Sequence, residues 1–238
     1  MNYAIVFAGG VGSRMQSPKL PKQLNEVCGI PIIVHTINHL QAHPDIDKVM
    51  VVCLEPYIDF MKELLNKYNL SKVFKVVAGG RTGQESICKG LQALDGIADD
   101  DDIVILHDGV RPIIDADLIS RNIDSVKQYG NAISCSSATE TICLAGDEGS
   151  IKDIMPRDKC MMGRAPQSFR YADIYNCHKR ANQEGYTTAI DSASMLHHYG
   201  YPLHFVQCSH FNIKITTPND LFLFTAFLKN SNENCGRK

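Results

Sequence analysis

The start of the chain joins a short apolar run to a glycine-rich turn, and this junction constrains the fold more than any other feature. Residues 3–7 (YAIVF) are apolar and too few for a buried helix, so they predict a buried strand. Residues 8–15 (AGGVGSRM) follow at once, and their three glycines leave backbone N–H groups free to close around phosphate oxygens. Arg14 and Lys22 supply two cations nearby. The junction therefore predicts a strand followed by a loop that grips a triphosphate.

Two well-known glycine-rich loops do not fit this segment. A dinucleotide fingerprint needs a third glycine that is missing here, and a P-loop needs a spacing and a Lys-Ser/Thr pair that are also missing. A glycine-rich turn without any ligand stays open as an alternative, because such turns are common in α/β folds. The cations Arg14 and Lys22 count against that alternative.

The composition limits the class of protein and its partners. The 238 residues are 44% hydrophobic and carry a net charge of −2, so no overall basic field draws in nucleic acid. The nine cysteines are scattered without a C-x-x-C pair, which predicts reduced thiols in a cytoplasmic protein rather than zinc or redox sites. We expect no membrane span and no signal peptide, because no apolar run is long enough and no basic segment precedes the first one.

Strand-like and helix-like segments alternate through the first half of the chain. The expected strands after the first are residues 49–53, 73–77 and 103–106, and the expected helices are residues 32–40, 57–68 and 84–94. This alternation predicts an α/β fold, with a mostly parallel sheet and helices on both faces. Ligands bind beyond the carboxyl ends of such strands. The glycine turn, Gly79-Gly80 and His107-Asp108 all follow strands and should meet there.

The second half of the chain is less regular. Residues 140–156 contain short apolar pieces interrupted by Gly146 and Gly149, which predicts a hairpin within an arm at about 136–160. We expect one domain over residues 1–230 and a frayed polar tail over 231–238. The remaining segments are expected as helices at 115–130, 172–185 and 221–229 and as strands at 132–136, 205–208 and 212–215.

Three motifs resemble one family of nucleotidyltransferases. Residues 8–15 followed by Pro21-Lys22-Gln23, residues 107–112 (HDGVRP) and residues 212–221 (NIKITTPNDL) are similar to the CTP-dependent polyol-phosphate cytidylyltransferases. That family includes enzymes for ribitol 5-phosphate and for 2-C-methyl-D-erythritol 4-phosphate. The resemblance covers residues 3–228 and implies a Rossmann-like nucleotidyltransferase sheet. It also implies transfer of CMP from CTP to a polyol phosphate, with release of pyrophosphate.

The resemblance assigns roles to individual residues. The implied catalytic residues are the cations Arg14, Lys22 and Lys214. The implied nucleotide-binding residues are Ala8, Gly9, Gly10, Gly12, Gly80, Ser86 and Asp108. Asp108 would also ligate Mg²⁺, which prefers few carboxylates together with phosphate oxygens. The implied polyol-phosphate ligands are Arg111, Thr141, Arg157 and Asp191. Thr141 and Arg157 lie on the arm, which in the family exchanges with a second subunit, so a homodimer is expected.

The motifs also leave alternatives open. Asp108 and Arg111 could form an ordinary loop ion pair. His107 is expected to pack rather than act as a base, because the attacking phosphate oxygen is already ionised at neutral pH. The arginine of the family's cytosine motif is replaced by Gly83, with Arg81 two places earlier, and the aspartate that precedes Asn212 is replaced by Phe211.

The acceptor is predicted from smaller features. The spacer between Met15 and Pro21, Val110, and residues 211–217 favour ribitol 5-phosphate, with methylerythritol phosphate as the alternative. Against this, residues 163–167 (GRAPQ) replace the Gln-Thr-Pro-Gln of the ribitol branch. A nucleotide-binding regulator without turnover is the alternative of a different class.

Overall fold

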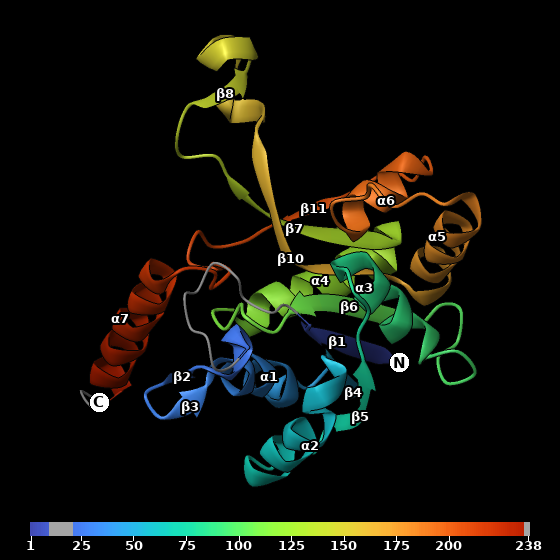
Figure 1. The fold of residues 1–238 in the computed structure, drawn as a ribbon, viewed down its shortest axis with the longest axis vertical. Helices are drawn as coiled ribbons and strands as arrows, with labels where there is room; N and C mark the ends of the chain where they lie inside the picture. Colours follow the sequence, from blue (N-terminus) through green and yellow to red (C-terminus); the bar gives the residue numbers. More distant parts are fainter. Residues whose placement is uncertain (10–20, 236–238) are drawn as a thin grey trace.

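One seven-stranded sheet forms the centre of the molecule in the computed structural model, which describes residues 1–9 and 21–235. The strand order is β11-β7-β10-β6-β1-β4-β5 (Figure 1). All neighbouring strands are parallel except β10, which is antiparallel to β6 and to β7. The strands are β1 (Asn2–Ala8), β4 (Lys48–Cys53), β5 (Val73–Ala78), β6 (Ile103–Asp108), β7 (Asn131–Ser137), β10 (Met161–Arg170) and β11 (Phe205–Gln207). The predicted mostly parallel α/β sheet is confirmed.

Helices cover both faces of the sheet because successive strand side chains point to opposite faces. In β1, Ala4 and Val6 pack in one apolar cluster, whereas Tyr3 and Ile5 pack in the other. The first cluster includes α1 (Ile32–Ala42), α2 (Ile58–Lys67) and α4 (Ala116–Tyr129). The second cluster includes α3 (Gly83–Gln92), α5 (Tyr171–Glu184) and α6 (Ser192–His198).

Local sequence signals set several helix ends. Thr82 and Asp115 cap α3 and α4, because their side-chain oxygens accept hydrogen bonds from backbone N–H groups in the first turn. Gly130 ends α4 with φ of 84°, a left-handed conformation that glycine adopts without a steric cost. Helix α7 (Pro218–Cys235) packs at the outer end of the molecule, beside the short strands β2 (Glu26–Val27) and β3 (Ile30–Pro31) (Figure 1).

The carboxyl ends of four parallel strands lie at one level. Phe7 pairs with Asp108, and Ala8 pairs with Cys53. Just beyond the strands, Gly109 N donates to Phe7 O over 2.9 Å, and Gly79 N donates to Cys53 O over 2.7 Å. The carboxyl end of β1 and the turns after β5 and β6 therefore meet at one edge of the sheet, as the sequence predicted for Gly79-Gly80 and His107-Asp108. The glycine turn beyond Gly9 lies outside the described residues.

An arm leaves the sheet between β7 and β10. Its tip is a two-stranded hairpin of β8 (Ile142–Ala145) and β9 (Ile151–Met155), and Figure 1 shows it projecting away from the body. The side chains of Leu144, Ile151 and Ile154 are exposed. The predicted hairpin is confirmed.

Four expectations about the second half need correction. Residues 212–215 are not a strand; they run as an irregular segment in which Ile215 N donates to Val110 O over 2.8 Å. Strand β10 was missed because Pro166 argues against a central strand, yet the register shift between Gly163 and Gln167 accommodates it. Helix α6 was missed because it is short. Helix α7 extends through Cys235, into the segment that was expected as a polar tail.

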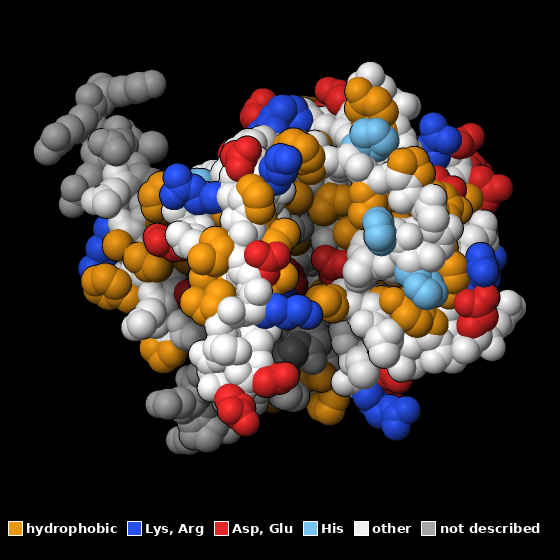
Figure 2. All heavy atoms as spheres, turned by 90° about the horizontal axis from the view of Figure 1, so that it is seen from above, with side chains coloured by type: hydrophobic (Ala, Val, Ile, Leu, Met, Phe, Trp, Pro, Cys, Tyr) orange, Lys and Arg blue, Asp and Glu red, His pale blue; other side chains and the backbone are white. Residues whose placement is uncertain are grey.

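On the face seen in Figure 2, basic and acidic side chains are interspersed with apolar ones, and neither charge predominates. Within the described part of the chain, no helix combines the length and apolarity needed to cross a membrane.

Candidate active site

A cleft of about 540 Å³ lies at the carboxyl edge of the sheet. It is lined by the glycines and hydroxyl expected around a nucleotide, namely Gly9, Gly80 and Ser86. The cations expected for phosphates also line it, namely Lys22, Arg111 and Lys214. Five basic side chains of the described residues line the cleft against two carboxylates, those of Asp108 and Asp191. The cleft is therefore suited to an anionic ligand, although the whole chain is slightly acidic.

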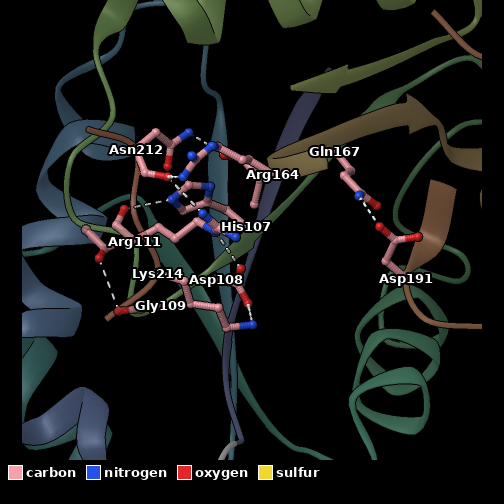
Figure 3. Close-up of polar contacts among 11 residues, drawn as sticks. His107, Asp108, Gly109, Arg111, Arg164, Gln167, Asp191, Asn212 and Lys214 are labelled. Atoms are coloured by element: carbon pink, nitrogen blue, oxygen red, sulfur yellow. Dashed lines mark hydrogen bonds and ion pairs between the residues drawn. The ribbon is translucent and has the colours of Figure 1, made fainter. Parts of the chain in front are cut away.

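Asp108 is the centre of the charged group. Its Oδ1 accepts a hydrogen bond from Lys214 Nζ at 2.7 Å, and its Oδ2 accepts one from Arg111 Nε at 2.8 Å (Figure 3). Burial on its own raises the pKa of Asp108, but the charges and hydrogen bonds of Lys214 and Arg111 outweigh it and hold the pKa well below its usual range. Asp108 is therefore an anion at any physiological pH.

Arg111 fastens the loop after β6 to the segment that carries Lys214. Its Nη1 donates to Asn212 O over 2.8 Å, in addition to the ion pair with Asp108. The loop ion pair that stood as an alternative from the sequence is thus present. It does not exclude ligand binding, because Arg111 lines the cleft and a guanidinium has five N–H donors.

His107 holds this loop from beneath the cleft. Its side chain is fully buried, and its Nε2 lies 3.0 Å from Arg111 O. Burial lowers the pKa of His107 to about 4, so the ring is neutral at pH 7. This agrees with the expectation that His107 packs rather than acting as a base.

The turn between β5 and α3 is shaped by Ser86. Its Oγ accepts from Gly80 N at 3.0 Å and donates to Thr82 O at 2.9 Å. A Cβ atom on Gly80 would lie 2.1 Å from Glu85 Cβ, so only glycine fits there. A contact between Ser86 or Gly80 and the base stays a prediction, and the structure adds that Ser86 holds the turn in its shape.

Gln23 was missed as a site residue, although it stands in the Pro-Lys-Gln motif. Its side chain is buried and its Nε2 donates to Ala8 O, at the end of β1. This bond ties the short 3-10 turn of residues Lys22–Leu24 to the strand that precedes the glycine turn. Gln23 thereby sets where Lys22 enters the cleft.

Comparison with known proteins agrees with this geometry. Residues 2–230 match the family described as IspD, 2-C-methyl-D-erythritol 4-phosphate cytidylyltransferase. The chain belongs to the IspD family. The ribitol-5-phosphate cytidylyltransferase of Streptococcus agalactiae serotype Ia is 46% identical over 226 residues, which cover 95% of each chain. The 2-C-methyl-D-erythritol 4-phosphate cytidylyltransferase of Syntrophus aciditrophicus is 39% identical over 227 residues, again 95% of each chain.

The fold comparison gives the same answer. The crystal structure of 4-diphosphocytidyl-2C-methyl-D-erythritol synthase from Anaerococcus prevotii aligns with a TM-score of 0.83 at 25% identity, over 96% of this chain and 98% of that one. The IspD-family relatives are cytidylyltransferases, so the predicted class of enzyme, a nucleotidyltransferase, is confirmed.

In this IspD-family chain, Asp191 lies on the far side of the cleft from Asp108 (Figure 3). Its Oδ1 accepts from Ser194 N at 2.8 Å and caps α6, while its Oδ2 accepts from Gln167 Nε2 at 2.7 Å. Gln167 also lines the cleft. It was not predicted as a site residue, although it ends the motif of residues 163–167. A substrate contact by Asp191 stays a prediction beside this structural role.

Two predicted IspD-family site residues, Thr141 and Arg157, do not line the cleft of their own chain. Thr141 and Arg157 are exposed on the arm, where Arg157 Nη1 donates to Thr139 O over 3.3 Å. Gly10, Gly12 and Arg14 fall outside the described residues. The roles of these five residues stay predictions.

No group of three or more His, Cys, Asp or Glu side chains that could hold a metal ion occurs in the described part of the IspD-family chain. Asp108 stands as a single carboxylate in the charged group. Phe211, which replaces the family aspartate, is 64% exposed and offers no ligand.

Proposed function

We propose that the protein transfers the CMP group of CTP to D-ribitol 5-phosphate and releases pyrophosphate. The observation that carries the proposal is the convergence of Lys214 and Arg111 on Asp108, in a cleft with more cations than carboxylates. The acceptor is suggested by the name of the 46% identical relative and by the sequence features around Met15, Val110 and Phe211.

The reaction needs charge neutralisation more than proton transfer. An oxygen of the acceptor phosphate bonds to the α-phosphorus of CTP, while the bond from that phosphorus to the bridging β-phosphate oxygen breaks. Pyrophosphate leaves with the electron pair, and no base is needed because the attacking oxygen is ionised. Lys22 and Lys214 would stabilise the charge that builds on the α-phosphate and the leaving group. Arg14 joins them by resemblance.

Asp108 fits a Mg²⁺ ion that is held mainly by the substrate. Magnesium binds through one or two carboxylates together with phosphate oxygens, and Asp108 is a permanent anion at the edge of the cleft. A carboxylate has about four lone-pair positions, so it can keep Lys214 and Arg111 and still ligate a metal. The ion would supply further charge neutralisation at the phosphates.

The active unit we propose is a homodimer. The arm carries exposed apolar side chains together with Thr141 and Arg157, which a single chain leaves away from its cleft. A second chain would bring these residues to the acceptor. We place the enzyme in a reducing cytoplasm, in agreement with the free thiols of the eight cysteines described.

The test is pyrophosphate release with CTP and Mg²⁺, with ribitol 5-phosphate and 2-C-methyl-D-erythritol 4-phosphate offered in separate reactions. Release with ribitol 5-phosphate supports the proposal, and release with methylerythritol phosphate alone replaces it with the alternative. Binding of CTP by calorimetry without release from either acceptor would instead indicate the regulator.

A further inference from the structure

Arg164 is a cation at the cleft that the reaction described above does not use. It lies on β10 and lines the cleft with Arg111 and Lys214. Its Nε donates to Ser136 Oγ and its Nη1 donates to Asn212 O, each over 2.8 Å. Figure 3 shows the side chain directed toward Asn212, on the same side as Arg111.

Arg164 has no carboxylate partner in the part of the chain that the structure describes. Neither Asp108 nor any other described Asp or Glu forms an ion pair with it. Residues 10–20 lie outside the described part of the chain, and their sequence contains no Asp or Glu. Nothing in these parts of the chain neutralises the guanidinium.

A second positive charge lies close by. Arg111 Nη1 and Arg164 Nη1 are each 2.8 Å from the same oxygen, Asn212 O, so the two nitrogens are no more than 5.6 Å apart. Burial and the charge of Arg111 both lower the pKa of Arg164. The two guanidinium groups repel each other in the free enzyme, and an anion placed between them would remove that cost.

Arg164 also retains donors for such an anion. A guanidinium has five N–H groups, and two of them are used in the bonds to Ser136 and Asn212. The remaining three have no partner among the described residues. Their planar arrangement matches a phosphate in a bidentate way.

The position of Arg164 in the sheet separates a phosphate bound there from the phosphates of the nucleotide. The carboxyl end of β1 and the Gly79-Gly80 turn after β5 lie on one side of β6, and β10 lies on the other. Arg164 therefore belongs to the half of the cleft left for the acceptor.

We propose that Arg164, together with Arg111, binds the phosphate group of the acceptor. The proposal rests on the proposed function for the identity of the acceptor.

The experiment compares Arg164→Gln with the wild type by steady-state pyrophosphate release. We expect the KM of ribitol 5-phosphate to rise on the order of tenfold to a hundredfold, as for a lost charge-assisted hydrogen bond, while the KM of CTP stays within about twofold. Arg164→Lys keeps the charge but loses the fork, so its KM should be intermediate. Arg121→Gln is the matched control, because Arg121 also donates to a backbone oxygen but does not line the cleft.

Inorganic phosphate provides a readout that needs no acceptor to be known. Calorimetry should show phosphate binding to the wild type and to Arg121→Gln, with a marked loss in Arg164→Gln. That result would stand even if ribitol 5-phosphate proved inactive. A rise in the KM of CTP alone, equal phosphate binding in all variants, or a loss of thermal stability without any change in KM would each overturn the proposal.

Discussion

Lys214 Nζ lies 2.7 Å from Asp108 Oδ1, although the two residues are 106 positions apart in the chain. The loop after β6 and the segment 212–215 are held together by Arg111 Nη1 on Asn212 O and by Ile215 N on Val110 O. Ile215 of this segment packs in a buried apolar cluster with Phe224 of α7. The contact is thus fixed by packing on both sides, and it delivers a cation to the strand end where a phosphate would bind.

Replacing Lys214 by alanine should reduce the rate of pyrophosphate release on the order of a hundredfold to a thousandfold, because one positioned charge is lost from the transition state. Circular dichroism should remain that of the wild type. Lys62→Ala is the matched control, since Lys62 forms an exposed ion pair with Asp59 at 3.2 Å away from the cleft. A Lys214→Ala enzyme that kept full kcat would refute the role given to this side chain.

Gly80→Ala should destabilise the fold by about 1–3 kcal/mol, because the new Cβ would lie 2.1 Å from Glu85 Cβ and the turn must shift. Gly83→Ala should not destabilise it, since a Cβ at Gly83 meets nothing within 4 Å. Urea unfolding of both variants measures the difference. Equal unfolding free energies would mean that the turn is not packed as described.

The stability of the wild type should fall as the pH drops from about 6.5 toward about 4, partly through His178. Burial lowers the pKa of His178 to about 4, so in this range the unfolded chain takes up the proton first. Each such histidine contributes up to about 1.4 kcal/mol per pH unit.

His178→Gln should therefore make the unfolding free energy depend less on pH between about 6.5 and about 4. A residual slope should remain, because His107 is also a buried histidine with a lowered pKa. Denaturant unfolding over a pH series measures it. An unchanged slope in His178→Gln would show that His178 is not buried as a neutral ring.

Mixing two inactive variants tests whether one chain's arm completes the other chain's site. Arg157→Ala and Lys214→Ala should each be nearly inactive alone. After subunit exchange, half of the dimers would carry one intact site, so activity should return to about a quarter of the wild-type value. Mixtures that stayed inactive despite proven exchange would argue that Arg157 acts within its own chain.

The sequence predicted the sheet well because its signals were local. Residues 3–7, 49–53 and 103–106 are apolar runs bounded by turns, and each became a strand. The carboxyl ends of these strands lie at one edge, because parallel strands share their direction. The positions of Gly80 and Asp108 could be predicted on this basis alone.

The features that the sequence did not predict depend on contacts between segments that are distant in the chain. Residues 212–215 alternate like a strand, yet their partners are Arg111 and Val110, which no local pattern names. Strand β10 contains Pro166, so its membership of the sheet depends on a register shift that only the neighbouring strands reveal. Gln23 and Arg164 were not predicted as site residues for the same reason. Their hydrogen bonds go to Ala8 and Asn212, which are distant from them in the sequence.

A competition between the two acceptors tests the proposed acceptor most directly. Equal concentrations of ribitol 5-phosphate and 2-C-methyl-D-erythritol 4-phosphate are mixed with CTP, Mg²⁺ and the enzyme, and the nucleotide products are identified by mass spectrometry. We expect the cytidine diphosphate conjugate of ribitol to predominate. Predominance of the methylerythritol conjugate, or the absence of both from an enzyme that is folded and binds CTP, would contradict this expectation.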